Sequence, residues 1–403
     1  MSEKRRDNKN RILHTGEVQL SNGRYRFKYV DLLGNEKYVY SWRLESRDPV
    51  KKGTRRDLSL REKEKLIQKD LMDGISTIGK NITVLELVQK YIKTKIGVRP
   101  NTRASYGTVV NLLKREPFGA KKIGTLTISD AKCWLIKLQQ EDGKSYSAIA
   151  SIRGVLRPAF EQAFEDDLVR KNIFNFQLVD VLVNDSVRRD SISREQEKKF
   201  LNFVKNDKHF RNYYEGFFIL FNTGMRISEF CGLCVADIDF RNHTININKQ
   251  LQKRGSKGYY ILPTKTDAGT RVIPMTADVE KCFKRMIKKR PKFEFEPTVD
   301  GVSGFLSFDK NGSIEYSLHW NRHMHYAVEK YNRIYKKELP NITPHVCRHT
   351  YCSKMANSGM NPKILQYLMG HSDITVTFNT YSHTKISDAE NELKRLDDIK
   401  MQN

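Results

Sequence analysis

The second half of the chain holds six side chains whose types together suit the cleavage of a phosphodiester bond. They are Arg226, Lys265, His345, Arg348, His371 and Tyr381. Two guanidinium groups can grip the non-bridging oxygens of a phosphate and neutralise the charge that develops during substitution at phosphorus. A tyrosine hydroxyl can attack phosphorus when nearby positive charge favours the phenolate, and a lysine or histidine can protonate the departing oxygen. These types predict metal-free phosphodiester chemistry if the fold brings them into one cleft.

The first of these residues lies next to an expected helix end. Arg226 follows an apolar run that ends at Phe221, and Gly224 between them is typical of a helix C-terminus. Arg226 is also three residues before Glu229, so the two side chains can form an ordinary helical ion pair. On these residues alone, a catalytic and a purely structural role for Arg226 both stay open.

The last four residues fall in two short segments. His345 and Arg348 are three residues apart, so they share a face if their segment is helical, and residues 343–344 (Thr-Pro) suit the start of that helix. His371 comes later, and Tyr381 follows it by ten residues. A single tyrosine is more often a core or surface residue than a nucleophile, so its role depends on the whole set.

Lys265 follows an expected strand. Residues 244–247 and 259–263 are typical of strands on either side of a basic turn, and we expect them to form a β-hairpin, with a third strand at 271–274. Lys265 would then sit near a strand end, where its ammonium group could reach a phosphate. A solvated lysine at a sheet edge is the plain alternative.

The ordered set resembles the catalytic signature of the tyrosine recombinases, also called phage-type integrases. The segments that carry this resemblance are Arg226, Lys265, His345-x-x-Arg348, Gly370-His371 and Tyr381. The resemblance is most specific over residues 190–390. Two departures are small: Met369 stands where leucine is usual, and Tyr381 follows His371 by ten residues rather than nine.

The resemblance implies a role for each residue. Arg226 and Arg348 would bind the scissile phosphate, and Lys265 would protonate the leaving 5′ oxygen. Two histidines, His345 and His371, would assist proton transfer, and Glu229 would support the site. Tyr381 would form a 3′-phosphotyrosyl link, which conserves the energy of the broken bond, so that the reaction would need no ATP, metal or other cofactor.

The N-terminal residues 1–75 are expected to form a small α+β module. Alternating residues at 17–20, 24–30 and 37–42, separated by Asn-Gly and Gly-Asn turns, predict a three-stranded antiparallel sheet covered by a helix at 58–72. The resemblance implies that this module binds arm-type DNA sites. The basic residues expected to face that DNA are Arg24, Arg26, Lys28 and Lys37.

Two further domains are expected. Residues 83–175 predict an all-helical domain, with a capping box at Thr83 and Glu86 and a helix kinked at Pro158. The resemblance implies that this is the core-binding domain. Its candidate basic face, for which a merely solvated surface is equally open, consists of Lys93, Lys95, Arg99, Arg103, Lys144 and Arg153. A polar linker at 183–190 leads to the catalytic domain, residues 190–403, which is expected to be mainly α-helical with a small β-sheet.

Composition agrees with a nucleic-acid partner. The chain has 403 residues, with 72 Lys and Arg against 47 Asp and Glu, which gives a formal net charge of +25. Such an excess attracts polyanions, and the length predicts about two to four domains. No stretch approaches the roughly twenty apolar residues that cross a bilayer. With six scattered cysteines and no signal-peptide core, we expect a soluble protein with reduced thiols in the cytoplasm, at the nucleoid.

The sequence therefore predicts a site-specific recombinase that integrates and excises a mobile element, similar to the integrases of conjugative transposons. By resemblance, its partners would be double-stranded DNA at core and arm-type sites, three further copies of itself in a tetramer on DNA, an excisionase and a host DNA-bending protein. The terminal stretch 387–401 could pack on a neighbouring protomer or equally on its own domain.

Three other functions compete with this prediction. The chain could be a type IB topoisomerase, which uses similar chemistry, or a DNA-binding regulator without catalysis. A zinc module or metal nuclease is the third, because some cysteines and histidines are spaced as metal ligands can be. The candidate ligands are Cys231, Cys234, His345, Cys347, His349 and Cys352.

Overall fold

A computed structural model describes most of the chain. The described residues are 5–31, 34–50, 53, 57–72, 81–186, 191–254, 258–336 and 338–381, with the side chains of residues 70 and 379–381 excepted. The chain divides into two units, Met1–Val187 and Arg188–Asn403. No helix among the described residues is long and apolar enough to cross a membrane. The terminal stretch 387–401 lies outside the described residues.

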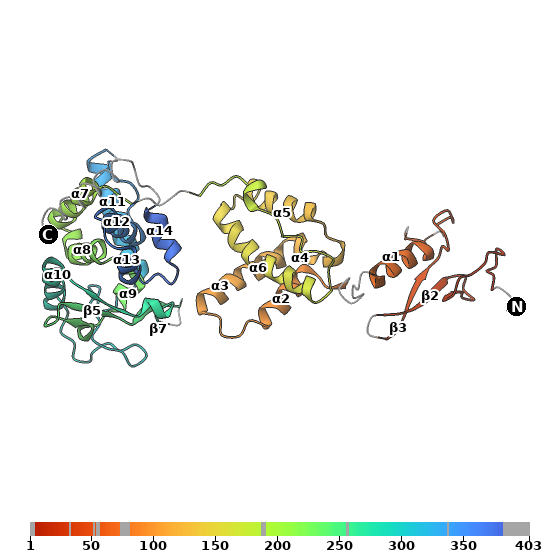
Figure 1. Cartoon of the computed structure of the whole chain (residues 1–403), viewed down its shortest axis with the longest axis horizontal. Helices are drawn as coiled ribbons and strands as arrows, with labels where there is room; N and C mark the ends of the chain where they lie inside the picture. The colour runs from red at the N-terminus through yellow and green to blue at the C-terminus, as the bar shows by residue number, and fades with distance from the viewer. Residues whose placement is uncertain are drawn as a thin grey trace, which may run out of the picture. The chain divides into compact units, whose positions relative to one another are not determined.

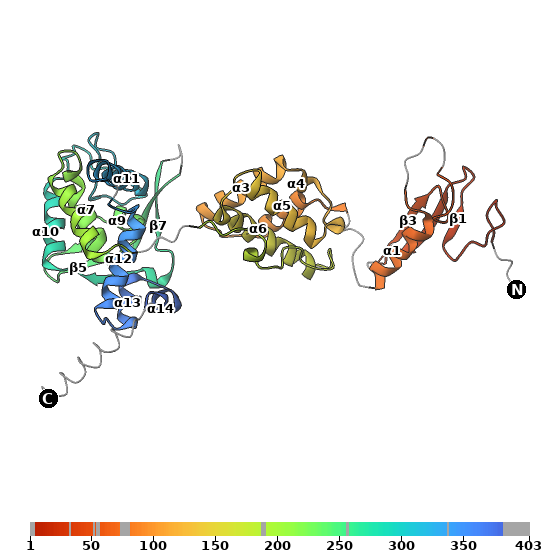
Figure 2. The same ribbon diagram turned by 90° about the horizontal axis from the view of Figure 1, so that it is seen from above.

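The first unit begins with the α+β module. Its strands are β1 (Glu17–Gln19), β2 (Tyr25–Val30) and β3 (Glu36–Ser41), which pair antiparallel in the order β1-β2-β3, and α1 (Leu60–Met72) lies against the sheet (Figures 1 and 2). Alternation along β2 turns Tyr25 and Phe27 inward, where they pack with Leu44 and Leu60. The predicted three-stranded sheet with one covering helix is confirmed.

The rest of the first unit is helical. Its helices are α2 (Val84–Lys93), α3 (Pro100–Arg115), α4 (Pro117–Ala120), η2 (Ile123–Thr125), α5 (Ile128–Gln140), α6 (Tyr146–Glu165) and η3 (Leu178–Asp180). Thr83 and Glu86 form the predicted capping box at the start of α2. At the centre of the core, Phe118 and Trp134 stack with ring centroids 4.3 Å apart. Helix α6 runs through Pro158, and the kink expected there stays a prediction.

The second unit is mainly helical, as predicted. Its helices are α7 (Arg194–Asn206), η4 (Phe210–Tyr213), α8 (Tyr214–Thr223), α9 (Ile227–Cys231), η5 (Val235–Asp237), η7 (Asp267–Gly269), α10 (Ala277–Lys288), α11 (Ser317–Ile334), α12 (Pro344–Asn357), α13 (Pro362–Met369) and α14 (Ile374–Tyr381). A large apolar core joins most of them, with Phe217, Phe221 and Trp320 among its fully buried side chains, and a smaller cluster of Cys352, Ala356, Leu365 and Met369 joins α12 to α13. Helices α12, α13 and α14 pack side by side (Figures 1 and 2).

The strands of this unit pair differently from the prediction. They are β4 (Ile238–Asp239), β5 (Thr244–Ile247), β6 (Lys249–Lys253), β7 (Tyr259–Pro263) and β8 (Arg271–Pro274). The expected hairpin between 244–247 and 259–263 is wrong, because β5 pairs with β4 and β8 while β7 pairs with β6. The sequence of β6 is too polar to signal a strand, yet Gln250 and Leu251 in it are buried, and the Gln250 amide donates to the Pro263 carbonyl.

Candidate active site

The corner between α8 and α9 holds Arg226. Helix α8 ends at Gly224, which adopts the left-handed conformation with φ of 62°, and Arg226 caps the start of α9. The Arg226 guanidinium donates to Glu229 Oε1 at 2.7 Å, and its backbone N–H donates to Glu229 Oε2 at 2.9 Å. The ion pair suggested by the sequence is therefore present. It also fixes the direction in which the Arg226 side chain points.

Arg348 projects from α12 into the same corner. Its guanidinium is 5% exposed and donates to the carbonyl of Gly224 at 2.7 Å and to that of Met369. These carbonyls close the C-termini of α8 and α13, where partial negative charge favours a cation. Burial, followed by the like charge of Arg226, lowers the pKa of Arg348 to about 9, so the side chain stays charged at neutral pH.

His371 reaches the corner from the far end of α13. That helix ends at Gly370, again with φ of 62°, and the Gly370 carbonyl accepts from the Arg226 guanidinium at 3.0 Å. The His371 ring is half-buried, and its Nδ1 lies 3.0 Å from the hydroxyl of Thr377. Burial, followed by the charges of Arg348 and Arg226, lowers the pKa of His371 from 6.5 to about 4. His371 is therefore neutral at physiological pH.

His345 lies on the exposed side of α12. Its Nε2 is 3.2 Å from Nε2 of His349, one helical turn further along, and both rings are exposed. A hydrogen bond at that distance needs one ring to donate and the other to accept. The sequence suggests His349 only as a possible metal ligand and does not predict its contact with His345.

Lys265 follows β7 directly, as predicted, in the connection that leads to β8. The loop is held in shape by Thr264, whose hydroxyl lies 2.7 Å from that of Thr270 and donates to the Thr266 carbonyl. The Lys265 side chain is exposed. The long side chain of an exposed lysine is suited to reach a bound phosphate.

Arg271 is a buried residue of this corner that sequence reasoning missed. Its side chain is completely buried and donates to three acceptors: the Leu368 carbonyl at 2.8 Å, the Gly269 carbonyl at 2.8 Å and Glu229 Oε2 at 3.1 Å. Arg271 thus joins the loop of Lys265 to the end of α13 and to the partner of Arg226. The sequence did contain a sign that Arg271 is buried. Side chains alternate along a strand, and Arg271 lies two residues before the buried Ile273, so both face inward.

Glu229 links Arg226 to Arg271. Its carboxylate is 2% exposed and contacts both Arg226 and Arg271. Burial alone would raise the pKa of Glu229, but the charges of Arg271 and Arg226 outweigh it and hold this pKa below its usual value. The carboxylate is therefore ionised and can orient both guanidinium groups.

Four of the predicted residues meet at the corner of α8, α12 and α13. Arg226 and Glu229 form an ion pair, Arg348 donates to the carbonyls of Gly224 and Met369, and His371 follows Gly370, whose carbonyl accepts from Arg226. Tyr381 is the last residue of α14, which packs on α12 and α13, and its side chain lies outside the described residues.

Two family models match the chain. Residues 1–71 match the DNA binding domain of Tn916 integrase, and residues 190–387 match the phage integrase family. A transposase from transposon Tn1545 of Streptococcus agalactiae serotype V is 43% identical over 402 residues, which cover 100% of this chain and 99% of the relative. The chain belongs to the phage integrase family of tyrosine recombinases. The resemblance inferred from the signature is confirmed, and the chain is a tyrosine-type site-specific recombinase, an enzyme that breaks and rejoins DNA.

Other relatives agree with this assignment. A transposase from transposon Tn916 of Enterococcus faecalis is also 43% identical over 402 residues and covers 100% of this chain. The solved structure of a Tn1549 transposon integrase in complex with a circular intermediate DNA has a TM-score of 0.74 at 39% identity, covering 78% of this chain and 99% of that chain. The predicted fold class and the likeness to integrases of conjugative transposons are confirmed for this recombinase.

The basic residues of the N-terminal sheet of the recombinase divide between its two faces. Arg26 pairs with Tyr40 and Lys28 with Tyr38 in register, so both lie opposite the buried face, and Lys28 forms an ion pair with Glu36 at 2.5 Å. Arg24 on the same face stacks over Tyr40, with its guanidinium 4.9 Å from the ring centroid. We call Arg24, Arg26 and Lys28 the outer basic face.

Lys37 does not join the outer basic face. It pairs with Tyr29, which packs against the core, so Lys37 lies on the side of the sheet that α1 covers. The expectation that four residues share one face fails here because side chains alternate between the two faces of a strand. Lys37 is next to Tyr38, which lies on the outer face, so Lys37 lies on the other face. Its side chain is nevertheless exposed near the turn.

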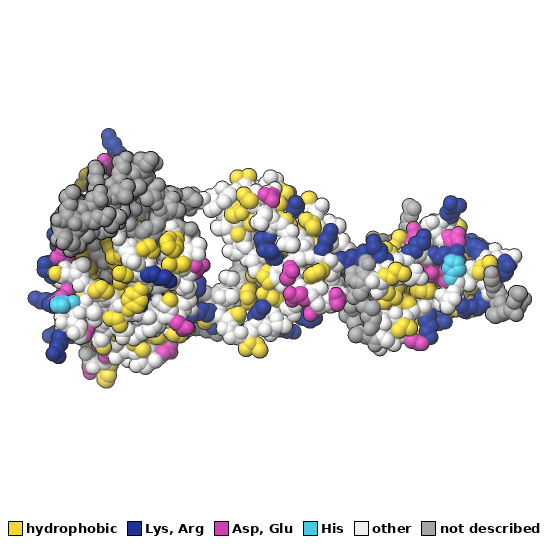
Figure 3. Space-filling view, viewed as in Figure 1, with side chains coloured by type: hydrophobic (Ala, Val, Ile, Leu, Met, Phe, Trp, Pro, Cys, Tyr) yellow, Lys and Arg dark blue, Asp and Glu magenta, His cyan; other side chains and the backbone are white. Residues whose placement is uncertain are grey.

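The helical domain contains one further difference from the sequence analysis. Arg153 is half-buried and donates to the carbonyls of Phe174 and Phe176, so it fastens the end of the domain instead of standing on a free basic face. Elsewhere on this domain and on the N-terminal module, Lys and Arg side chains are spread over the surface in view (Figure 3).

The cysteines do not support the zinc alternative. Cys231, Cys234, Cys347 and Cys352 are all buried, and burial raises the pKa of the Cys231 and Cys347 thiols well above the usual value, which disfavours the thiolate that zinc needs. Within the described ranges, no cysteine belongs to a group of three potential metal ligands.

Proposed function

We propose that this recombinase integrates and excises a transposon, and that Tyr381 is its nucleophile. The Tyr381 hydroxyl oxygen attacks the scissile phosphorus, a P–O bond to tyrosine forms, and the bond from phosphorus to the 5′ oxygen breaks. Lys265 supplies the proton that the departing 5′ oxygen takes. Attack by a 5′ hydroxyl of the partner strand then reverses these steps and releases the tyrosine.

The observation that carries this proposal is the attachment of Arg226 and Arg348 to the backbone carbonyls of two helix ends. Each guanidinium has five N–H donors, and the carbonyls and Glu229 occupy only some of them. The remaining donors can bind the non-bridging oxygens of a phosphate with no reorganisation when charge develops. Preorganised donors of this kind are what phosphoryl transfer without a metal requires.

The neutral state of His371 fits this arrangement. With its Nδ1 at 3.0 Å from the Thr377 hydroxyl, Nε2 can carry the ring proton and donate it in a hydrogen bond to a phosphate oxygen. In this proposal His345, which is hydrogen-bonded to His349, takes up the proton that Tyr381 loses. His371 works at neutral pH without first having to lose a charge.

We further propose the partners of the reaction. The N-terminal module would bind arm-type DNA sites and the helical domain would grip core sites opposite the catalytic domain, with four copies assembled on paired sites. An excisionase and a host DNA-bending protein would control direction, and the reaction would take place at the nucleoid in the cytoplasm. The relatives that match along the whole chain are transposases of transposons, which supports a mobile element as the substrate.

Covalent trapping tests the proposal. The full-length protein is incubated in EDTA with nicked duplexes made from the DNA that flanks its gene, and adducts are resolved under denaturing conditions. We expect an adduct that is absent from Tyr381→Phe and retained by Tyr326→Phe, which changes an exposed tyrosine on α11. Binding without an adduct would favour a regulator, and relaxation of supercoiled DNA without strand exchange would favour a topoisomerase.

A further inference from the structure

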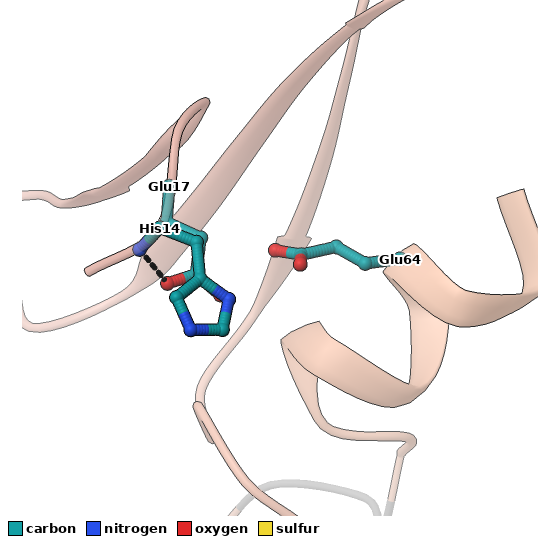
Figure 4. A group of neighbouring side chains, drawn as sticks. All are labelled: His14, Glu17 and Glu64. Atoms are coloured by element: carbon teal, nitrogen blue, oxygen red, sulfur yellow. Dashed lines mark hydrogen bonds and ion pairs between the residues drawn. The ribbon is translucent and has the colours of Figure 1, made fainter. Parts of the chain in front are cut away.

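Three ligand-type side chains meet in the N-terminal module, outside the catalytic unit. His14 precedes β1, Glu17 begins it, and Glu64 projects from α1. One donor atom from each lies within 4.8 Å of the other two, and Figure 4 shows Glu64 reaching from its helix toward Glu17 and His14. Among the residues that the structure describes, no other group of three such ligands lies this close together.

One carboxyl oxygen of this cluster lacks a hydrogen bond. The Glu17 side chain is fully buried and Glu64 is 6% exposed, and among the described residues Arg61 is the cation hydrogen-bonded to Glu17, with its Nε 3.0 Å from Glu17 Oε1. Arg61 also serves Glu45 at 2.5 Å. Glu64 shares a hydrogen bond with Glu17, but its Oε1 is buried and accepts none. A buried polar oxygen without a partner costs free energy, so a further partner is expected at Glu64 Oε1.

The donor set selects the kind of cation. An imidazole nitrogen with two carboxylate oxygens suits zinc and similar borderline ions, which take three protein ligands and a water, whereas magnesium and calcium prefer oxygen ligands only. Glu17 keeps free lone pairs beside its contacts with Arg61 and the His14 backbone. His14 is 62% exposed, so its ring can swing inward and leaves a path for the ion.

We propose that His14, Glu17 and Glu64 bind a zinc-class divalent cation that fastens α1 to the sheet of the N-terminal module. The module has a small buried core, Tyr25, Phe27, Leu44 and Leu60, and modules of this size commonly rely on a metal or a disulfide. The ion joins the segment before β1 to the covering helix. Its role is structural and separate from the strand-cleavage chemistry.

Zinc binding by the full-length protein tests this inference. The protein is stripped with EDTA, dialysed against zinc chloride, and its bound zinc is measured beside that of His14→Ala and Glu64→Gln. Other histidines and cysteines bind zinc equally in all three proteins, so the expected result is one zinc fewer per chain in each variant. Glu45→Gln, which removes another partner of Arg61 but no ligand, keeps the full amount.

Hydrogen exchange locates the ion. Peptides from residues 60–72 should exchange about ten-fold more slowly in the wild type when free zinc is ten times its dissociation constant, and should not respond in His14→Ala. Equal zinc content in wild type and both variants, without slower exchange, would overturn the proposal. Equal protection by millimolar magnesium would overturn the assignment to zinc. His14 is exposed, so its variant stays informative even if Glu64→Gln unfolds. Covalent trapping in EDTA on core DNA is independent of all these outcomes.

Discussion

At the scale of single residues, Arg271 is the side chain that holds the site in register. Its guanidinium contacts the loop of Lys265, the end of α13 and Glu229 at once. The variant Arg271→Lys keeps the positive charge. Its ammonium group cannot, however, donate to all three acceptors that the planar guanidinium group reaches. We expect single-turnover cleavage to fall about ten-fold or more, with DNA affinity within about two-fold of wild type.

The comparison variant for this measurement is Arg285→Lys, which changes an exposed arginine on α10 and should leave cleavage unchanged. Arg271→Met goes further, because it removes one of the two cations that hold the buried Glu229 carboxylate. We expect it to lower the free energy of unfolding by about 3–5 kcal/mol. Full cleavage by Arg271→Lys would mean that Arg271 only packs.

His371 gives a prediction about pH. Its pKa is about 4 in the folded protein against an ordinary 6.5, so the unfolded chain binds more protons between these values. The contribution of His371 to stability is therefore complete above pH 6.5 and is lost as the pH falls toward 4. Urea unfolding of His371→Gln and wild type should show a difference in stability that changes over this window. An NMR titration of the ring with a midpoint near 6.5 would contradict the burial and charge argument.

The site residues were predictable to different degrees, and the reason is physical. Arg226, Arg348 and His371 lie in segments with a recognisable spacing, and the structure places them at one corner. Arg271 belongs to no such segment, because its contacts come from residues 229, 269 and 368, which only the tertiary fold brings together. Strand alternation indicates that Arg271 faces inward, but it does not indicate which residues Arg271 contacts.

At the scale of elements, two left-handed helix ends form the floor of the site. Gly370 has φ of 62°, and a Cβ there would lie 2.8 Å from Arg271 Nη1 and 3.0 Å from the Ala268 carbonyl. Gly370→Ala therefore meets backbone strain of about 1–2 kcal/mol and a steric conflict with the residues that hold the loop of Lys265. We expect lower stability in urea and a loss of covalent adduct.

Gly301→Ala separates the two causes in this experiment. Gly301 has φ of 80°, but nothing lies within 4 Å of an added Cβ, so this variant carries the strain without the steric conflict. It should lose a similar part of its stability and keep its cleavage activity. If both variants cleave DNA equally well, the close contact between Gly370 and Arg271 does not affect cleavage.

The strands show where element prediction from the sequence ends. The bounds predicted for β5 and β7 match the structure, because β5 alternates and β7 is a short apolar run before a turn. Their pairing was wrong because β6, with its sequence Lys-Gln-Leu-Gln-Lys, carries too few apolar residues to be recognised as a strand. The chain turns after Ile247, and the hairpin partner of β7 is therefore β6, which the sequence does not reveal as a strand.

At the scale of the whole molecule, a net charge of +25 predicts salt-sensitive binding to DNA. Each phosphate contact that a cation makes releases bound counterions, so the logarithm of the affinity falls with the logarithm of the salt concentration, with a slope of about −0.9 per contact. The outer basic face of the N-terminal sheet is expected to make several of these contacts with arm-type DNA. The slope then gives the number of phosphate contacts, whether or not the protein also contacts the bases.

Register within this sheet makes the test specific. Arg26 lies on the outer basic face with its guanidinium 5.1 Å from the ring centroid of Tyr38, while Lys37 lies on the face that α1 covers. For arm-site binding by the full-length protein, Arg26→Gln should reduce the steepness of the salt dependence by about one unit, and Lys37→Gln should leave it unchanged. Both variants lose one positive charge, so a general effect of net charge would lower both slopes equally. A reduced slope in Lys37→Gln alone would place the DNA on the opposite side of the sheet.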